Sequence, residues 1–381
     1  MSIPDVAIDN ERQELAKEYA RIRRRLMLVE LLIGGLYTLS WLVFGWSSEL
    51  KEISVSITDN EWILVAIFGM VFGGIYYLIM VPLSYFSGFV LPHRFGLSTQ
   101  TLLGWVVDQI KGLGVGLILG FILLEIIYAL LRVAPDTWWI LAALAMLLFN
   151  VILANLAPVI LFPIFYKFVP LGDDHAELVE RLMELSKEAD TYVKGVFKFD
   201  MSRRTKAANA GLTGLGNTRR IILGDTLIEE FTMDEIETIL AHELGHHINK
   251  DIPLGILIES LITLIGLYAA SLVLSWGTQS LGFNGPSDVA AMPLFVLVMG
   301  VYGLITMPLG NAYSRWRERL ADAYAIEVTR NGTAYASALT RLANQNLADA
   351  NPEPWVEFLL YSHPSLGRRI AYAETASETI N

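Results

Sequence analysis

Long apolar runs constrain this chain more than any other feature of its sequence. Six stretches are long enough to cross a hydrocarbon core about 30 Å thick, which takes about 20 helical residues. They are residues 26–46, 62–91, 112–131, 138–166, 252–276 and 292–313. Of the 381 residues, 54% are hydrophobic and only 18% are charged, which leaves a soluble fold too little polar surface. The sequence therefore predicts a mainly α-helical, multi-pass membrane protein with about six spans.

The positions of lysine and arginine predict how these spans are oriented. Basic residues precede the first run and follow the last one: Arg12, Lys17, Arg21, Arg23, Arg24 and Arg25, then Arg315, Arg317 and Arg319. The loop 277–291, between the fifth and sixth runs, contains neither lysine nor arginine. Because these residues accumulate in cytoplasmic loops, we expect both termini to lie in the cytoplasm.

Two polar segments, 167–251 and 314–381, are the parts of the chain that can form a soluble domain. In the first we expect a helix over 175–189, a strand over 192–199, a hairpin from 207–215 to 220–223 and a helix over 233–250. Thr232, with Glu235 three residues later, has the spacing of a capping box at the start of the last helix. The second segment is predicted to be helical and broken by prolines.

The helix expected over 233–250 contains the pattern His-Glu-x-x-His. His242 and His246 are one turn apart on one helix face, so both imidazoles can reach one ion. Glu243 lies beside them and can take a proton from a water whose pKa zinc lowers to about 7. The alternative is a polar helix with a hydrogen-bonded histidine pair. The pattern favours a metallopeptidase site.

A catalytic zinc ion needs a third protein ligand, and the chain has no cysteine. Carboxylates just past the last apolar run are candidates, since Glu318 and Asp322 are one turn apart on one face. Glu318 can bind the metal, while Asp322 can accept the ring N–H of a histidine ligand. The alternative is a solvated salt-bridge ladder with the three neighbouring arginines.

Several motifs together resemble one known family. The His-Glu-x-x-His pattern is followed by Ser-Arg-x-x-Glu-x-x-Ala-Asp, from Ser314 to Asp322. Further matching segments are 96–100, 157–158 with 165–171, 209–210, 220–227 and 361–364. In this order they resemble the Ste24-like (type I) CAAX prenyl proteases, within the M48 family of membrane zinc metallopeptidases. The resemblance runs from about residue 60 to the C-terminus.

The resemblance implies a set of roles. One zinc ion per chain would be held by His242, His246 and Glu318, with Glu243 as the general base. His363 and Arg369 match a His-Pro-x-x-x-x-Arg element that would stabilise an oxyanion. Alternatively, Arg369 only orients Asp322 or Glu318, and His363 only precedes a helix. Asn209 and Ala210 match a strand whose edge pairs with extended substrate backbone.

The expected fold is a membrane bundle joined to a small, cytoplasmic-side α+β zincin-like metallopeptidase domain. We expect an N-terminal cytoplasmic segment (1–25), a four-helix membrane region (26–166), a metallopeptidase part with the His-Glu-x-x-His helix (167–251), two membrane helices (252–313) and a C-terminal metallopeptidase part with the third ligand (314–381). Eukaryotic members of the family carry seven membrane helices, whereas six are expected here.

The implied function is zinc-dependent endopeptidase activity that removes the C-terminal tripeptide of prenylated CaaX proteins. One alternative is an HtpX-like quality-control protease of the membrane. Another is a catalytically silent, zinc-binding membrane scaffold, against which Glu243 argues because a structural site needs no base.

Charge and missing segments indicate partners and location. The formal charge of −11 argues against nucleic acid, which leaves a peptide or protein substrate, possibly prenylated, and the lipid bilayer as partners. The segment between Leu227 and Glu235 has no long acidic insertion, and the C-terminus has no endoplasmic-reticulum retrieval signal. Both favour the plasma (inner) membrane of a prokaryote, with the active site in the cytoplasm. Nothing in the sequence specifies an oligomeric state.

Three carboxylates lie within the apolar runs: Glu30, Glu125 and Glu259. Such groups are unfavourable in lipid and usually face protein or water. We expect Glu125 and Glu259 to face a wet cavity that leads to the metal, whereas Glu30 lies near its helix end.

Overall fold

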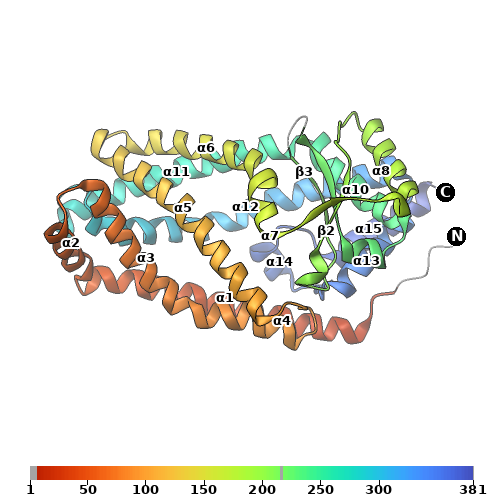
Figure 1. Ribbon diagram of the computed structural model, residues 1–381, viewed down its shortest axis with the longest axis horizontal. Helices are drawn as coiled ribbons and strands as arrows, with labels where there is room; N and C mark the ends of the chain where they lie inside the picture. The colour runs from red at the N-terminus through yellow and green to blue at the C-terminus, as the bar shows by residue number, and fades with distance from the viewer. Residues whose placement is uncertain (1–6, 215–217, 381) are drawn as a thin grey trace.

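The computed structural model describes residues 7–214 and 218–380. It has two parts, a set of long helices and a smaller α+β domain, which lie at opposite ends of the molecule (Figure 1). The long helices are α1 (Asn10–Val43), α3 (Glu61–Tyr85), α5 (Leu102–Val133), α6 (Trp138–Leu156), α11 (Asp251–Ser280) and α12 (Met292–Thr329). With their continuations, these six are long and apolar enough to cross a membrane, which confirms the predicted spans.

Two of these helices change pitch near prolines. Helix α3 contains Pro82 and continues into the π-helical turn η1 (Phe86–Val90) and α4 (Leu91–Arg94). Helix α6 continues into η2 (Ala157–Leu161), which contains Pro158, and then α7 (Phe162–Phe165). Proline removes one backbone donor, so the hydrogen-bond ladder shifts locally and the helix continues.

The six helices form a closed ring. Each contacts two neighbours, in the cyclic order α1, α3, α5, α6, α11, α12 and back to α1. Buried side chains gather at the end away from the domain, where Trp41, Phe68 and Trp138 belong to one core cluster. The middle stretches of the six helices contain no buried residue. These stretches are residues 17–37, 73–90, 106–127, 144–157, 251–265 and 295–314. The middle of the ring therefore lacks the close-packed core of a solid bundle.

The domain is built on a four-stranded sheet in the order β1-β2-β4-β3. The strands are β1 (Phe168–Pro170), β2 (Val196–Phe199), β3 (Ala210–Thr213) and β4 (Arg220–Gly224). Strands β2 and β4 are parallel, and the outer pairs are antiparallel, so β3 is an edge strand. The predicted hairpin is β3 and β4, although its turn lies outside the described residues. Strand β1 was not predicted, and β2 is shorter than expected.

Helices cover this sheet and complete the domain. They are α8 (Ala176–Glu188), α9 (Asp225–Glu230), α10 (Met233–Ile248), α13 (Gly332–Gln345), α14 (Pro354–Leu360) and α15 (Leu366–Ile380). One core cluster includes Leu182, Leu223, Leu240, Leu339 and Ala373, so it joins both polar segments of the sequence. Shorter elements are α2 (Trp46–Ile57), η3 (Asp173–His175), η4 (Met201–Arg203) and η6 (Val289–Ala291).

Ring and domain are joined by continuous helices. Helix α12 runs without interruption from the ring into the domain, and α11 begins at Asp251, three residues after α10 ends. A charged contact adds to this connection, since Arg204 of the domain donates to both carboxylate oxygens of Asp108 on α5, at 2.7 and 2.9 Å. The candidate site lies at this junction.

Candidate metal centre

Helix α10 is fixed at its first turn. The Thr232 hydroxyl accepts from the backbone N–H of Glu235, and the Glu235 carboxylate accepts from the backbone N–H of Thr232, which confirms the predicted capping box. Glu235 is fully buried and also accepts from Ser337 and Arg341, at 2.6 and 2.8 Å. The helix that carries the two histidines is therefore tied to the C-terminal segment.

A glycine lets α10 and α12 approach each other closely. A Cβ atom on Gly245 would lie 2.9 Å from the Cα atom of Ala321, closer than atoms can pack. Only glycine therefore fits between His242 and His246 on this face. The close approach brings Glu318, one turn before Asp322 on α12, up to the histidines.

His242, His246 and Glu318 converge on one point. Their ligand atoms all lie within 4.8 Å of one another. The two Nε2 atoms are 3.2 Å apart, and the Glu318 carboxylate oxygens are 3.4 Å from His242 Nε2 and 3.3 Å from His246 Nε2. Sequence spacing predicted His242 and His246 and offered Glu318 as a candidate, which the family resemblance then named as the third ligand, and the structure brings all three together.

The second ring nitrogen of each histidine faces an aspartate. His242 Nδ1 lies 2.9 Å from Asp322 Oδ1, and His246 Nδ1 lies 2.7 Å from Asp251 Oδ2. A carboxylate at this position holds the proton on Nδ1 and leaves a lone pair on Nε2. When the rings are neutral, these lone pairs face the Glu318 carboxylate, whose Oε2 atom is buried without a hydrogen-bond partner in the described chain. A cation would satisfy this cluster of acceptors.

These contacts also change the basicity of the histidines. Burial alone would lower the pKa of His246, but hydrogen bonds to Glu318 and Asp251 raise it to about 9. Burial likewise opposes a charged His242, but Asp322 and Glu318 raise its pKa above the usual value. The surrounding carboxylates thus favour positive charge at the point where the Nε2 atoms of His242 and His246 converge.

Each aspartate is in turn held by an arginine. Arg369 donates to both Asp322 oxygens, at 2.7 and 3.0 Å, and the Tyr335 hydroxyl donates to Asp322 at 2.6 Å. Arg317 donates to Asp251 Oδ1 at 2.6 Å and to the carbonyl of Asn249. The salt-bridge ladder considered for Glu318 and Asp322 is wrong, because both are buried and contact the histidines.

Three of these residues were not predicted as part of the site. Asp251, five residues after His246, could have been noticed as a nearby acid. Arg317 stood in the sequence as one of three basic residues after the last span. Tyr335 gave no signal, because its contact with Asp322 depends on how α13 packs against α12.

Glu243 lies between the histidines and the edge strand. A Cβ atom on Gly211 of β3 would lie 4.0 Å from Glu243 Oε2. Burial raises the pKa of Glu243, while the charges of His242 and His246 oppose that shift. A carboxylate with a raised pKa is suited to accept and return a proton when it lies beside the metal group, that is, beside His242, His246 and Glu318.

His363 and Arg369 both reach the group from the C-terminal segment. His363 Nε2 lies 3.3 Å from Glu318 Oε1, and its Nδ1 is 2.9 Å from the Ser362 hydroxyl. Arg369 is buried, with its donors on Asp322 and on the Tyr335 hydroxyl, and is 3.6 Å from Glu318. His363 faces the metal group more openly, with a side chain that is 59% exposed.

Asn209 and Ala210 lie at the start of the edge strand. The carbonyl of Asn209 accepts from the backbone N–H of Gly224, and its side chain accepts from the N–H of Ala210. Since pairing alternates along an antiparallel ladder, Ala210 and Leu212 direct their backbone groups toward the free edge.

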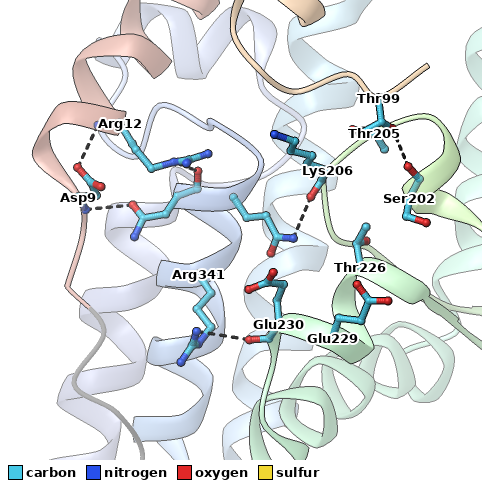
Figure 2. Close-up of a pocket in the computed structure, with 12 residues that line it drawn as sticks. Asp9, Arg12, Thr99, Ser202, Thr205, Lys206, Thr226, Glu229, Glu230 and Arg341 are labelled. Carbon is cyan, nitrogen blue, oxygen red and sulfur yellow. Dashed lines mark hydrogen bonds between the residues drawn. The ribbon is translucent and has the colours of Figure 1, made fainter. Parts of the chain in front are cut away.

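Two cavities lie near the junction of ring and domain. One, of about 300 Å³, borders His246 and Glu318 and extends between α11 and α12 to Glu259. Glu259 therefore lies where it was expected, whereas Glu125 borders neither cavity. The other, of about 490 Å³, is lined by Arg12, Lys206, Glu230 and Arg341 among others, and by none of the predicted site residues (Figure 2).

Comparisons with known proteins place the chain in a family. Residues 173–377 match the family model of peptidase family M48, and residues 4–167 match that of the CAAX prenyl protease N-terminal region, described as five membrane helices. An uncharacterized metalloprotease of Bacillus subtilis, YhfN, is 30% identical over 364 residues, covering 94% of this chain and 85% of the relative. CAAX prenyl protease 1 of Saccharomyces cerevisiae is 31% identical over 322 residues, covering 79% and 70%.

The fold is shared with a solved structure, Ste24p of S. mikatae. The TM-score is 0.84, with 98% of this chain and 91% of that chain covered, at 24% sequence identity. The match over the membrane region favours the CAAX protease branch over the HtpX-like alternative. The predicted resemblance is thereby confirmed, and the silent-scaffold alternative is not supported. The chain belongs to peptidase family M48 and is a multi-pass membrane metalloprotease.

Proposed function

We propose that this enzyme is a zinc endopeptidase that binds one Zn²⁺ through His242, His246 and Glu318. The observation that carries the proposal is the convergence of the two imidazole Nε2 atoms and one carboxylate, with Glu243 beside them. Two nitrogens and one oxygen are a donor set typical of catalytic zinc, which keeps one position open. When bound, the ion supplies Lewis acidity, which acidifies a water and polarises a peptide carbonyl.

The residues of the chain then divide the proton transfers among them. Glu243 accepts the proton of the attacking water and passes it to the nitrogen of the leaving amine. Burial lowers the pKa of His363, so its ring is neutral at pH 7 and Nε2–H can donate to the developing oxyanion. Arg369 has its donors on Asp322 and Tyr335, so it acts by holding Asp322 and, through it, His242.

The substrate backbone would lie along β3. Ala210 and Leu212 offer their backbone carbonyls on the free edge, since the Asn209 side chain accepts from the Ala210 N–H and the Glu243 carboxylate from the Leu212 backbone. An extended peptide added to this edge would pass Glu243 and place one carbonyl at the metal. This arrangement favours an unfolded segment over a folded loop.

The substrates would be membrane-associated peptides or proteins, and prenylated CaaX tails fit best. Relatives named CAAX prenyl protease cover most of this chain, and the unfilled middle of the ring gives a lipidated segment space beside the site. The basic residues before α1 and around Arg317 support a cytoplasmic active site, in the plasma membrane of a prokaryote. Segments 167–251 and 314–381 would form the metallopeptidase domain.

Cleavage in detergent of a farnesylated Cys-a-a-X peptide and its unprenylated twin tests the proposal. We expect the wild-type enzyme to cleave the farnesylated peptide before its last three residues. In Glu243→Gln the cleavage rate should fall by about 10²–10⁴-fold while zinc stays bound. Equal cleavage of both peptides would keep the endopeptidase but remove the role of the prenyl group. Full activity of Glu243→Gln would contradict the mechanism.

A further inference from the structure

The cavity beside His246 is built from one face of each of two membrane helices. Gly255, Glu259 and Ile262 line it from α11, and Gly310, Tyr313 and Arg317 line it from α12. A Cβ atom added to Gly255 or Gly310 would meet nothing within 4 Å, so the glycines border open space. Because His246 and Glu318 also line it, the cavity leads directly away from the metal centre.

Most charges along this cavity are already paired. Asp251 and Arg317 bind each other, and Glu318 belongs to the metal group. Glu259 has no hydrogen bond or ion pair with any residue that the structure describes. The Tyr313 hydroxyl oxygen is buried and likewise has no partner in the described chain. The cavity thus has one exposed carboxylate, that of Glu259, which has no counter-charge among the described residues.

These two groups are informative because they lie on membrane helices. A carboxylate within a spanning segment is unfavourable unless it meets water or a counter-charge, and a buried hydroxyl is unfavourable without a hydrogen bond. No described residue supplies Glu259 with a counter-charge, and its side chain is exposed, so a partner from outside the chain can reach it. Such a partner would carry a cationic group.

We propose that this cavity is the subsite for the part of the peptide on one side of the scissile bond, and that Glu259 selects a cationic group there. The inference rests on the endopeptidase function proposed above. The cation is an ammonium or guanidinium, from a Lys or Arg side chain or from a peptide amino terminus.

Helix geometry fixes how far the cation lies from the cleaved bond. Glu259 follows Asp251 by eight residues on α11, which is about 12 Å along the helix axis at 1.5 Å per residue. An extended peptide covers that length in about three to four residues. The selected residue is therefore expected within about four positions of the scissile bond.

A peptide series tests the inference. Starting from the peptide cleaved best, each position within four residues of the cleavage site is changed in turn to Lys, to norleucine of similar length, or to Glu. We expect Lys to exceed norleucine by about tenfold or more in kcat/KM at one position, mainly through KM, since only the ammonium can form a charge-assisted hydrogen bond with Glu259. Acetylating the amino terminus distinguishes an α-ammonium from a side chain as the source of the cation.

Variants assign the preference to its residue. Glu259→Gln should bring the Lys-to-norleucine ratio close to one, Glu259→Asp should keep it, and Glu259→Lys should favour the Glu peptide. Glu125→Gln, a carboxylate of another membrane helix that borders neither cavity, is the matched control and should keep the wild-type ratio. Fluorescence anisotropy of a labelled Lys peptide on Glu243→Gln holoenzyme should show about tenfold weaker binding when Glu259→Gln is added.

Two results would overturn the inference: a series in which no position prefers Lys and acetylation of the amino terminus has no effect, or a preference for the cation that survives Glu259→Gln. If Glu259→Gln does not fold, the peptide series on the wild-type enzyme still decides the first of these. Failure of the wild-type enzyme to cleave any peptide would instead count against the endopeptidase function, and the two failures are thereby distinguished.

Discussion

The two histidines of the metal centre are held by the same kinds of partner in different surroundings. His242 is backed by Asp322 and Arg369, and His246 by Asp251 and Arg317. The side chain of Asp322 is only 3% exposed and is also bound by Tyr335, whereas that of Asp251 is 14% exposed and borders the cavity. One side of the centre is sealed by the domain, and the other faces the ring.

This difference separates two requirements of a membrane protease. A metal ligand keeps its orientation best when its partner is buried and fully hydrogen-bonded. A substrate also needs a path to the metal, and that path must pass the histidine ligand with the more exposed surroundings, which is His246. The sealed side therefore fixes the geometry of the centre, and the open side provides access while an aspartate–arginine pair still holds His246.

The largest effect on activity is expected from a change at Glu318, which contacts both histidines. Glu318→Ala removes the ligand that contacts both histidines, so metal binding and catalysis should be lost together. Activity should fall by the full enzymatic acceleration, at least about 10⁶-fold. Zinc content by mass spectrometry and peptide cleavage measure this. Glu327→Ala, an exposed carboxylate on the same helix, is the control and should behave as wild type.

The two aspartates should differ in their effect on stability. Asp322→Asn and Asp251→Asn should each weaken zinc binding by about 10–100-fold, because each loses the carboxylate that orients a ligand. Asp322→Asn also removes the carboxylate that Arg369 binds through two hydrogen bonds and leaves it only the Glu318 carboxylate at 3.6 Å, which destabilises the fold by up to about 3–5 kcal/mol. Asp251→Asn should destabilise less, since Arg317 keeps the carbonyl of Asn249 and borders the cavity.

Chelator competition and thermal unfolding in detergent measure these two quantities. Equal losses of stability in the two variants would remove the distinction between a sealed and an open side.

The pH dependence of zinc affinity should also distinguish the two sides. Zinc binds neutral imidazole, so the proton on His246, with a pKa of about 9, must leave before the metal binds. Affinity should therefore fall up to about tenfold per pH unit as pH drops below about 9. Asp251 raises this pKa, so in Asp251→Asn the fall should begin at lower pH. An unchanged pH profile in that variant would contradict the role of Asp251.

The smallest effect is expected from Tyr335→Phe. The change removes one hydrogen bond to Asp322 while both contacts from Arg369 remain. A loss of about 1 kcal/mol in stability is expected, with zinc affinity reduced less than in Asp322→Asn. A loss as large as that of Asp322→Asn would show that Tyr335, and not Arg369, holds the sealed side together.

Features with a local signal could be predicted from the sequence. The six spans, the capped helix with His242 and His246, and the spacing of Glu318 and Asp322 all depend on residues within one helix. The hairpin of β3 and β4 was predicted for the same reason. Glu259 could be expected near a cavity because a carboxylate within an apolar run has few alternatives.

Features that depend on packing could not be predicted. The parallel pairing of β2 with β4 and the closed ring of helices bring distant segments together without a local pattern. Asp251 and Arg317 are 66 residues apart in sequence, and the tight contact of Gly245 with Ala321 is visible only once α10 and α12 pack. The motif left two roles open for Arg369, and its hydrogen bonds to Asp322 favour the orienting role, which depends on packing between distant segments.

X-ray absorption at the zinc edge tests the central claim most directly. The purified enzyme should hold about one zinc ion per chain, with two imidazoles and oxygen donors and, since the chain lacks cysteine, no sulfur. His246→Ala should lose that signal. A protein that takes up no zinc, or a zinc shell with fewer than two imidazoles, would contradict a centre built from His242, His246 and Glu318.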